Sequence, residues 1–266
     1  MSLLHIKSNW YTPFTSKNNK PLEENIMKIL VINGSPKVEQ SNSMVLTRAF
    51  LEGAGWGDAE VISVEKLNFR SCIGCYGCWT KTPGKCVLKD DMNDVLPKLV
   101  EADVVVWSFP LYYFSLPGDL KNFIDRQLPL ALPDMAPDSE TGDHPSRYDL
   151  SNQRHIYIST CGFWTDKGNY ESIYAMLDRW FGKGEVETIF VGQGGVMQAA
   201  NMEITDDMPD EVKGMKQILD GFMSTVRQAG KEFAGGGINP ETKTALAQPM
   251  FPQEVYEKGA NESFGV

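Results

Sequence analysis

The chain has 266 residues, of which 42% are hydrophobic and 23% are charged, so it can form one large domain or two small ones around a substantial core. Acidic residues outnumber basic ones by 35 to 25, which gives a formal net charge of -10. A surface this negative repels phosphate backbones, so we expect no nucleic acid partner.

The hydrophobic pattern disfavours two further classes, membrane proteins and secreted proteins. The longest apolar stretch, around residues 104–114, is too short and too interrupted to cross a bilayer, so we expect no membrane association. The first residues, MSLLHIKSNWYTPF, lack the charged region and the apolar run of a signal peptide. We therefore expect a cytoplasmic protein.

A regular alternation of strands and helices begins at Met27, after a polar N-terminal extension at residues 1–26. The apolar patterns predict strands within residues 27–36, 59–67, 102–110, 154–162 and 185–195. They predict helices at residues 42–54, 90–101, 117–128, 169–182 and 210–233. This order predicts a doubly wound α/β sandwich over residues 27–237, with a five-stranded parallel sheet and helices on both faces.

Three segments interrupt or follow this alternation. Residues 70–89 form a loop that is rich in cysteine, and residues 131–150 are rich in Pro, Asp and Ser and predict a surface insertion. Residues 238–266 carry little periodicity and predict a C-terminal arm.

Ligands of open α/β sheets bind beyond the carboxyl ends of the strands, where the strand order reverses. The loop after the first strand offers hydroxyls, backbone amides and one lysine before a helix begins, a combination that stabilises a phosphate. Its candidate ligands are Ser35, Lys37, Ser41, Asn42 and Ser43. The alternative is that Ser41 or Asn42 only caps the helix. Neither a Walker motif nor a G-x-G-x-x-G motif occurs in the chain.

Aromatic side chains follow the third and fourth strands. Residues 110–114 have the sequence PLYYF, and a planar ring could stack there, unless the aromatics pack on a helix or a second subunit. Residues 159–164 have the sequence STCGFW, in which an isolated Cys161 is more typical of a small buried side chain than of a nucleophile. The three histidines have no convincing partner, so we expect no hydrolytic site.

Four of the five cysteines lie within fifteen residues, at Cys72, Cys75, Cys78 and Cys86. The spacing of the first three brings their thiolates within reach of one metal centre, and ferredoxin-type [4Fe-4S] loops are similarly compact. Structural zinc sites more often split their ligands into two distant pairs. A [4Fe-4S] cluster, a zinc ion and free thiols all remain as interpretations.

Three stretches, MKILVINGSPK with SNS, SCIGCYGCWTKTPGKCVLKDDM and FPLYYFSLPGDLKNFIDR, resemble the NADPH-dependent FMN reductase family and its branch of iron–sulfur flavoproteins. The resemblance implies a flavodoxin-like fold and an FMN phosphate cradled by Ser35, Lys37, Ser41, Asn42 and Ser43. It implies that the isoalloxazine is bordered by Pro110, Leu111, Tyr112, Tyr113 and Phe114. It implies that the other edge of the ring is approached by Thr160, Cys161 and Gly162. In the iron–sulfur branch the four cysteines carry a cluster, whereas other relatives have similar cysteines without one.

The function that we expect is an oxidoreductase that passes electrons from NADH or NADPH through bound FMN to a small-molecule or protein acceptor. The cofactor carries this chemistry, so we name no catalytic residue. The alternative is a non-enzymatic electron carrier or redox sensor, flavodoxin-like or iron–sulfur in type. We expect a homodimer or homotetramer, because the aromatic loops and the long tail offer surface for a second copy.

Overall fold

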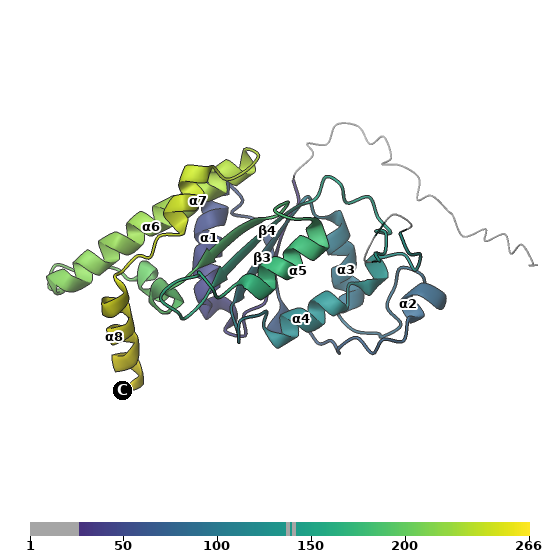
Figure 1. Cartoon of the computed structure of the whole chain (residues 1–266), viewed down its shortest axis with the longest axis horizontal. Coiled ribbons are helices and arrows are strands. Elements are labelled where there is room, and N and C mark those ends of the chain that lie inside the picture. Colours follow the sequence, from purple (N-terminus) through teal and green to yellow (C-terminus); the bar gives the residue numbers. More distant parts are fainter. Residues whose placement is uncertain (1–26, 137–138, 140–141) are drawn as a thin grey trace, which may run out of the picture.

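Five parallel strands form one sheet in the order β2-β1-β3-β4-β5 (Figure 1). A computed structural model describes residues 27–136, 139 and 142–266, and the extension predicted at residues 1–26 lies outside them. The strands are β1 (Ile29–Asn33), β2 (Glu60–Ser63), β3 (Val104–Pro110), β4 (Arg154–Thr160) and β5 (Glu187–Val191). The order reverses between β1 and β3, which is the flavodoxin-like arrangement, so the predicted fold class is confirmed.

The central strand β3 is buried on both of its faces. Val104 and Val106 belong to one core cluster, whereas Val105 and Trp107 belong to the other. Successive side chains of a strand point to opposite faces, and a strand covered on both faces therefore has a continuous apolar sequence.

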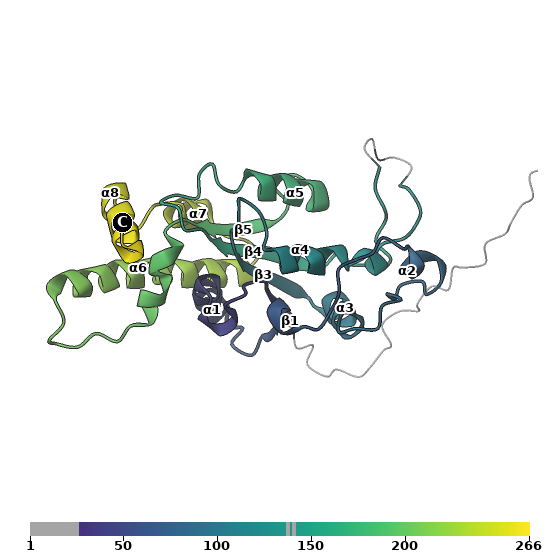
Figure 2. The same cartoon turned by 90° about the horizontal axis from the view of Figure 1, so that it is seen from below.

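Helices cover both faces of this sheet, and Figure 2 shows α1 and α5 on opposite sides of the strands. One face packs against α1 (Asn42–Ala54) and α6 (Asp210–Ala234). The other face packs against α3 (Met92–Glu101), α4 (Gly118–Asp125) and α5 (Glu171–Phe181). Among the described residues, no helix combines the length and the apolar character needed to cross a bilayer.

Two sequence predictions need correction. The strand predicted at residues 59–67 ends at Ser63, because β2 is an edge strand and its partner β1 ends at the paired Asn33. The chain then turns into the 3-10 helix η2 (Val64–Lys66). The arm predicted without periodicity contains α7 (Pro240–Leu246) and α8 (Gln253–Phe264), each with a proline at its start. Helices this short show few turns of a pattern, and Tyr256 is the buried residue of α8.

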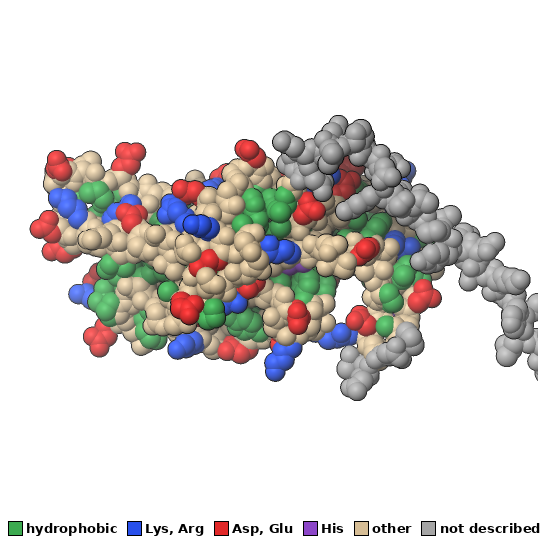
Figure 3. Space-filling model, turned by 90° about the horizontal axis from the view of Figure 1, so that it is seen from above, with side chains coloured by type: hydrophobic (Ala, Val, Ile, Leu, Met, Phe, Trp, Pro, Cys, Tyr) green, Lys and Arg blue, Asp and Glu red, His purple; other side chains and the backbone are tan. Residues whose placement is uncertain are grey.

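Charged side chains of both signs are mixed on the face of the molecule shown in Figure 3. The chain also forms exposed ion pairs, such as Arg227 with Glu52 across α6 and α1 at 2.7 Å and Lys98 with Glu60 at 2.6 Å. Exposed pairs of this kind contribute little to stability. The fold therefore depends mainly on the two apolar clusters.

Helices α1 and α6 approach each other closely because glycines lie at their contact. A Cβ atom added to Gly53 would lie 1.9 Å from the carbonyl oxygen of Arg227. A Cβ atom added to Gly230 would lie 2.0 Å from the carbonyl oxygen of Phe50. Both obstacles are backbone atoms, so relief would require the helices to move apart.

We predict that Gly230→Ala lowers the free energy of unfolding by about 1–3 kcal/mol or more, since it overpacks this contact. The matched control is Gly221→Ala in the same helix, where an added Cβ meets nothing within 4 Å. That change should raise stability by up to about 1 kcal/mol, because alanine favours the helix. Urea unfolding measures both changes, and effects of the same sign would contradict the close contact.

Candidate functional site

Three loops meet at the carboxyl edge of the sheet, where the strand order reverses. Asn33 at the end of β1 pairs with Ser108 of β3, and Pro110 at the end of β3 pairs with Thr160 of β4. The amide of Gly34 donates to the carbonyl of Ser108 at 2.8 Å, and other backbone hydrogen bonds also join these loops. The structure therefore brings together the loops that the sequence predicted as the ligand site.

The loop after β1 has its serine hydroxyls buried and hydrogen-bonded. The Ser41 hydroxyl accepts from the amide of Met44 at 3.3 Å and lies 2.8 Å from the Ser43 hydroxyl. The Ser35 hydroxyl accepts from the amide of Lys37 at 3.3 Å. Ser41 is thus the N-cap of α1, and the ligand role of the same turn stays a prediction.

Asn33 holds this loop in shape, a role that we did not predict. Its side-chain amide donates to the carbonyl of Val38 at 3.1 Å, and its side-chain oxygen accepts from the amide of Ser35 at 3.0 Å. Val38 has a φ of 49°, which is unfavourable for a β-branched residue. The sequence signal that could have revealed this role is a polar residue at the end of an otherwise apolar strand.

The aromatic loop after β3 is a tight turn with an exposed tip. Tyr112 and Ser115 exchange two backbone hydrogen bonds at 3.0 Å. The two residues between them, Tyr113 and Phe114, have φ values of 49° and 61°, where glycine and asparagine are usual. Tyr113 is 98% exposed, and Phe114 stacks on Phe163 of the next loop with ring centres 5.5 Å apart. The tip therefore presents aromatic surface toward solvent at the ligand edge.

The other aromatic-loop and β4 residues are less exposed. Leu111 and Cys161 lie in the core cluster, and burial raises the pKa of the Cys161 thiol. The Cys161 thiol donates to the carbonyl of Thr165 at 3.6 Å, which confirms its interpretation as a small buried side chain. Thr160 is buried, whereas Gly162 is exposed. Gly162 therefore leaves the backbone of this loop open to a ligand.

The C-terminal arm closes one side of this edge, which the sequence did not indicate. The hydroxyl of Tyr256 in α8 donates to the carbonyl of Gly162 at 2.9 Å. The side chain of Gln193, which follows β5, donates to and accepts from the backbone of Phe251 at 2.8 and 3.0 Å. The arm is therefore part of the site and not a free tail.

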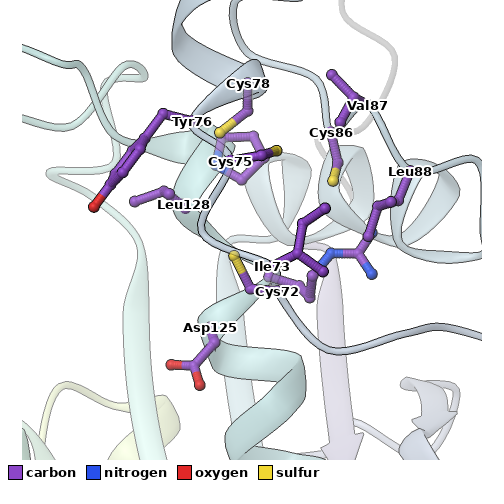
Figure 4. Close-up of a pocket in the computed structure, with 12 residues that line it drawn as sticks. Cys72, Ile73, Cys75, Tyr76, Cys78, Cys86, Val87, Leu88, Asp125 and Leu128 are labelled. Carbon is purple, nitrogen blue, oxygen red and sulfur yellow. The ribbon is translucent and has the colours of Figure 1, made fainter.

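The four clustered cysteines line one hollow, called the cysteine hollow below (Figure 4). Figure 4 shows their sulfur atoms around a common space. Cys78 is buried in the one-turn helix α2 (Gly77–Thr80), whereas Cys72 and Cys75 are exposed. Burial raises the pKa of the Cys78 thiol, and the charges of Cys86 and the other two cysteines raise it further.

The predicted surface insertion braces this loop. The indole N–H of Trp79 donates to the carbonyls of Leu128 and Ala131 at 3.3 and 3.1 Å, and its ring stacks on Tyr76. The Trp79 ring also lies 4.8 Å from the ring of His144 in the insertion. The cysteine loop is therefore packed, through Trp79, against the segment that follows α4 and against the insertion.

A buried ion pair joins the cysteine loop to the end of α4. Arg126 is 1% exposed, and its two terminal nitrogens donate to the two carboxylate oxygens of Asp90 at 2.8 and 2.7 Å. The bond to Arg126 lowers the pKa of Asp90. Burial lowers the pKa of Arg126, but the bond to Asp90 and the charge of Cys86 outweigh it and leave this pKa raised.

A single metal ion does not fit the described residues. One zinc ion needs its sulfur ligands about 2.3 Å from its centre. No group of three or more His, Cys, Asp or Glu side chains in the described residues could hold one ion. The four cysteines that line the cysteine hollow match a [4Fe-4S] group in the number and type of ligands only.

The cysteine hollow and the carboxyl edge lie at opposite ends of α4. This helix begins at Gly118 beside the aromatic loop, and Asp125 at its end lines the hollow. Eight residues of helix span about 12 Å. Figures 1 and 2 both place α2 at the far end of the molecule from α8.

Residues 27–136 match the model of the NADPH-dependent FMN reductase family. This match confirms the resemblance. An iron–sulfur flavoprotein of Methanocaldococcus jannaschii is 35% identical over 107 residues, which are 40% of this chain and 54% of that protein. An iron–sulfur flavoprotein of Archaeoglobus fulgidus is 39% identical over 106 residues, which are 39% of this chain and 46% of that protein. The chain thus spans about half the length of these curated relatives.

The fold is also similar to that of solved structures. An FMN-dependent NADH-azoreductase from Bacillus anthracis in complex with FMN aligns with a TM-score of 0.51 and 20% identity. The alignment covers 79% of this chain and 100% of that chain. At this identity the likeness concerns the fold.

We predict that Asp90→Asn lowers the free energy of unfolding by about 3–5 kcal/mol near neutral pH, since it leaves a buried arginine unpaired. The folded pKa of Asp90 lies below its usual value of 3.8, so the contribution is present above that pH and is lost as the pH falls through the folded pKa. The difference between wild type and variant should therefore shrink in acid. Chemical unfolding at several pH values measures it.

The matched control is Asp125→Asn, which removes an exposed pair with Lys121 in α4. This control should cost no more than about 0.5 kcal/mol. Equal losses of unfolding free energy in the two variants would show that the buried pair of Asp90 and Arg126 contributes no more to stability than the exposed pair.

Proposed function

We propose that the protein is an FMN-dependent oxidoreductase that takes electrons from NADH or NADPH and passes them to a small-molecule or protein acceptor. The observation that carries this proposal is that three loops meet where the strand order reverses between β1 and β3. One loop suits a phosphate, the second presents exposed aromatic rings, and the third supplies backbone beside them. The match of residues 27–136 to the FMN reductase family supports the same assignment.

The loop after β1 would hold the phosphate of FMN. The first turn of α1 leaves N–H groups without partners inside the helix, and the helix dipole favours an anion at that end. The buried hydroxyls of Ser35, Ser41 and Ser43 are already fixed by hydrogen bonds, while Lys37 is exposed and Asn42 is half-buried. Fixed donors bind an anion without a further loss of side-chain freedom.

The isoalloxazine would lie between the aromatic turn and the loop after β4. Pro110 and residues 112–114 would border it on one side, and Thr160 and Gly162 would approach the other edge. Bound FMN supplies the hydride and electron chemistry, so the chain has to position the ring and to shield it from water. Cys161 is buried and its thiol pKa is raised, so it has no role as a nucleophile in this proposal.

The cysteine hollow would hold a [4Fe-4S] cluster through Cys72, Cys75, Cys78 and Cys86. The names of the two archaeal relatives support this assignment, and so does the arrangement of four thiols around one space. A cluster supplies electron transfer in single steps. Its place at the far end of α4 suits an exit of electrons toward a second partner.

We also propose that the protein works in the cytoplasm as a homodimer or homotetramer. Tyr113, Phe114 and Phe163 form exposed aromatic surface at the ligand edge, which a second copy would cover. The rival function is a flavodoxin-like carrier or redox sensor, which binds the same flavin but does not oxidise a nicotinamide.

We predict that anaerobic mixing of the FMN-loaded protein with NADH or NADPH bleaches the flavin absorbance rapidly. The exposed aromatic turn leaves room for a nicotinamide to stack against the ring. Stopped-flow absorbance measures the rate, and chromatography of the heat-released cofactor identifies it as FMN. Bleaching only by a partner protein would favour the carrier instead, and recovery of FAD would contradict the phosphate site.

We predict that Asn42→Asp weakens FMN binding by at least tenfold and leaves riboflavin binding unchanged. A carboxylate at the first position of α1 repels the phosphate, and at about 4 Å such repulsion costs on the order of 4 kcal/mol near a protein surface. The same charge favours the helix itself, so the unfolding temperature of the apoprotein should not fall. Titration by flavin fluorescence measures both ligands.

Riboflavin is the matched control, because it has the ring without the phosphate. An equal loss of affinity for FMN and for riboflavin would indicate a general disturbance of the loop. Unchanged affinity for FMN in the folded variant would place the phosphate elsewhere.

A further inference from the structure

We propose that Arg126 sets how readily the cluster in the cysteine hollow accepts an electron, by adding a hydrogen bond and a positive charge to it. This inference rests on the proposed [4Fe-4S] cluster. Arg126 lines the same hollow as the four cysteines, although it comes from the end of α4 and not from the cysteine loop.

The guanidinium of Arg126 is held rigidly. Its two terminal nitrogens bind both oxygens of Asp90, and one of them also donates to the carbonyl of Arg70. A planar group bound at this many points keeps its orientation. The Asp90 carboxylate in turn accepts from the amide of Arg70 at 3.2 Å, so the cation is fixed to the first part of the cysteine loop.

One of the three guanidinium nitrogens of Arg126 has no hydrogen-bond partner among the described residues. Its Nε atom is buried and has no hydrogen-bond partner in the described residues, although the other two nitrogens are used. A buried donor without a partner is unfavourable, so it needs a reason in a native protein. The sulfur atoms around the cysteine hollow are acceptors for which this donor is suited.

The charge of Arg126 is as important as its donor. Four thiolates around an iron–sulfur core leave a net negative group, and each added electron makes it more negative. An arginine stays protonated under all ordinary conditions, and charge and hydrogen bonds to the sulfurs control the potential of such clusters. Asp90 opposes this effect, because it brings a negative charge to the same place.

A purely structural role makes a different prediction. If Arg126 only ties α4 to the cysteine loop through Asp90, removing either partner has the same consequence. Both variants would then lose stability or iron together, and neither would move the potential in a direction set by its charge.

The test measures the midpoint potential of the cluster in anaerobic protein loaded with FMN, iron and sulfide, by a redox titration followed with electron paramagnetic resonance. Arg126→Gln should lower the equilibrium constant for one-electron reduction at least tenfold, a shift of about 59 mV to more negative potential. Asp90→Asn should shift the potential in the positive direction. Arg126→Lys keeps the charge without the Nε donor, so it should give a smaller negative shift.

The control is Arg154→Gln, which lies on β4 against the ring of Phe233 and outside the cysteine hollow. It should leave the potential unchanged. Iron and sulfide content and thermal unfolding are measured for every variant. If Arg126→Gln does not fold, Arg126→Lys and Asp90→Asn still distinguish the proposed role from a purely structural one, since their expected shifts in potential have opposite signs.

Unchanged potentials, or shifts of one sign, in variants with full iron content would overturn the role of Arg126 and leave the cluster in place. Wild-type protein that takes up no iron would overturn the cluster and this inference together. Flavin bleaching by NADH or NADPH would still report on the proposed oxidoreductase function, so the failures are distinguishable.

Discussion

The pairing of β1 with β3 is the constraint on which the rest of the structure depends. This pairing places β2 on one side and β4 on the other, so the loops after β1, β3 and β4 leave the same edge side by side. It also requires β3 to be buried on both faces, which explains its apolar sequence from Val104 to Trp107. A change that disturbed this pairing would separate the phosphate loop from the aromatic turn.

Much of this arrangement was predictable because its signals are local. The period of α1 and the N-cap at Ser41 indicated the helix, and the run from Val104 indicated the central strand. The length of β2 was not predictable, since it is set by where its neighbour ends. Contacts between distant segments also escaped prediction, because Tyr256 and Arg126 meet their partners only after folding.

Helix α4 connects the two candidate sites, and its two ends contribute residues to them. Its first turn follows the aromatic loop, and its last residues form a wall of the cysteine hollow. The two sites therefore share one rigid element of about 12 Å, and their separation is fixed by the helix and not by a flexible loop. A fixed separation matters for electron transfer more than for hydrolysis, because electrons move between centres that do not touch.

Backbone strain marks the same two sites. Among the described residues, five that are not glycine have a positive φ: Val38, Tyr76, Tyr113, Phe114 and Gln193. All five lie in the loops that form the ligand edge or the cysteine hollow. Each such residue costs on the order of 1–3 kcal/mol and persists only where its surroundings enforce it. Asn33 enforces the turn at Val38, the stack on Trp79 supports Tyr76, and Phe251 holds Gln193. The strained residues therefore lower the stability of the fold at the places where the backbone has to hold a fixed geometry, as a cofactor site requires.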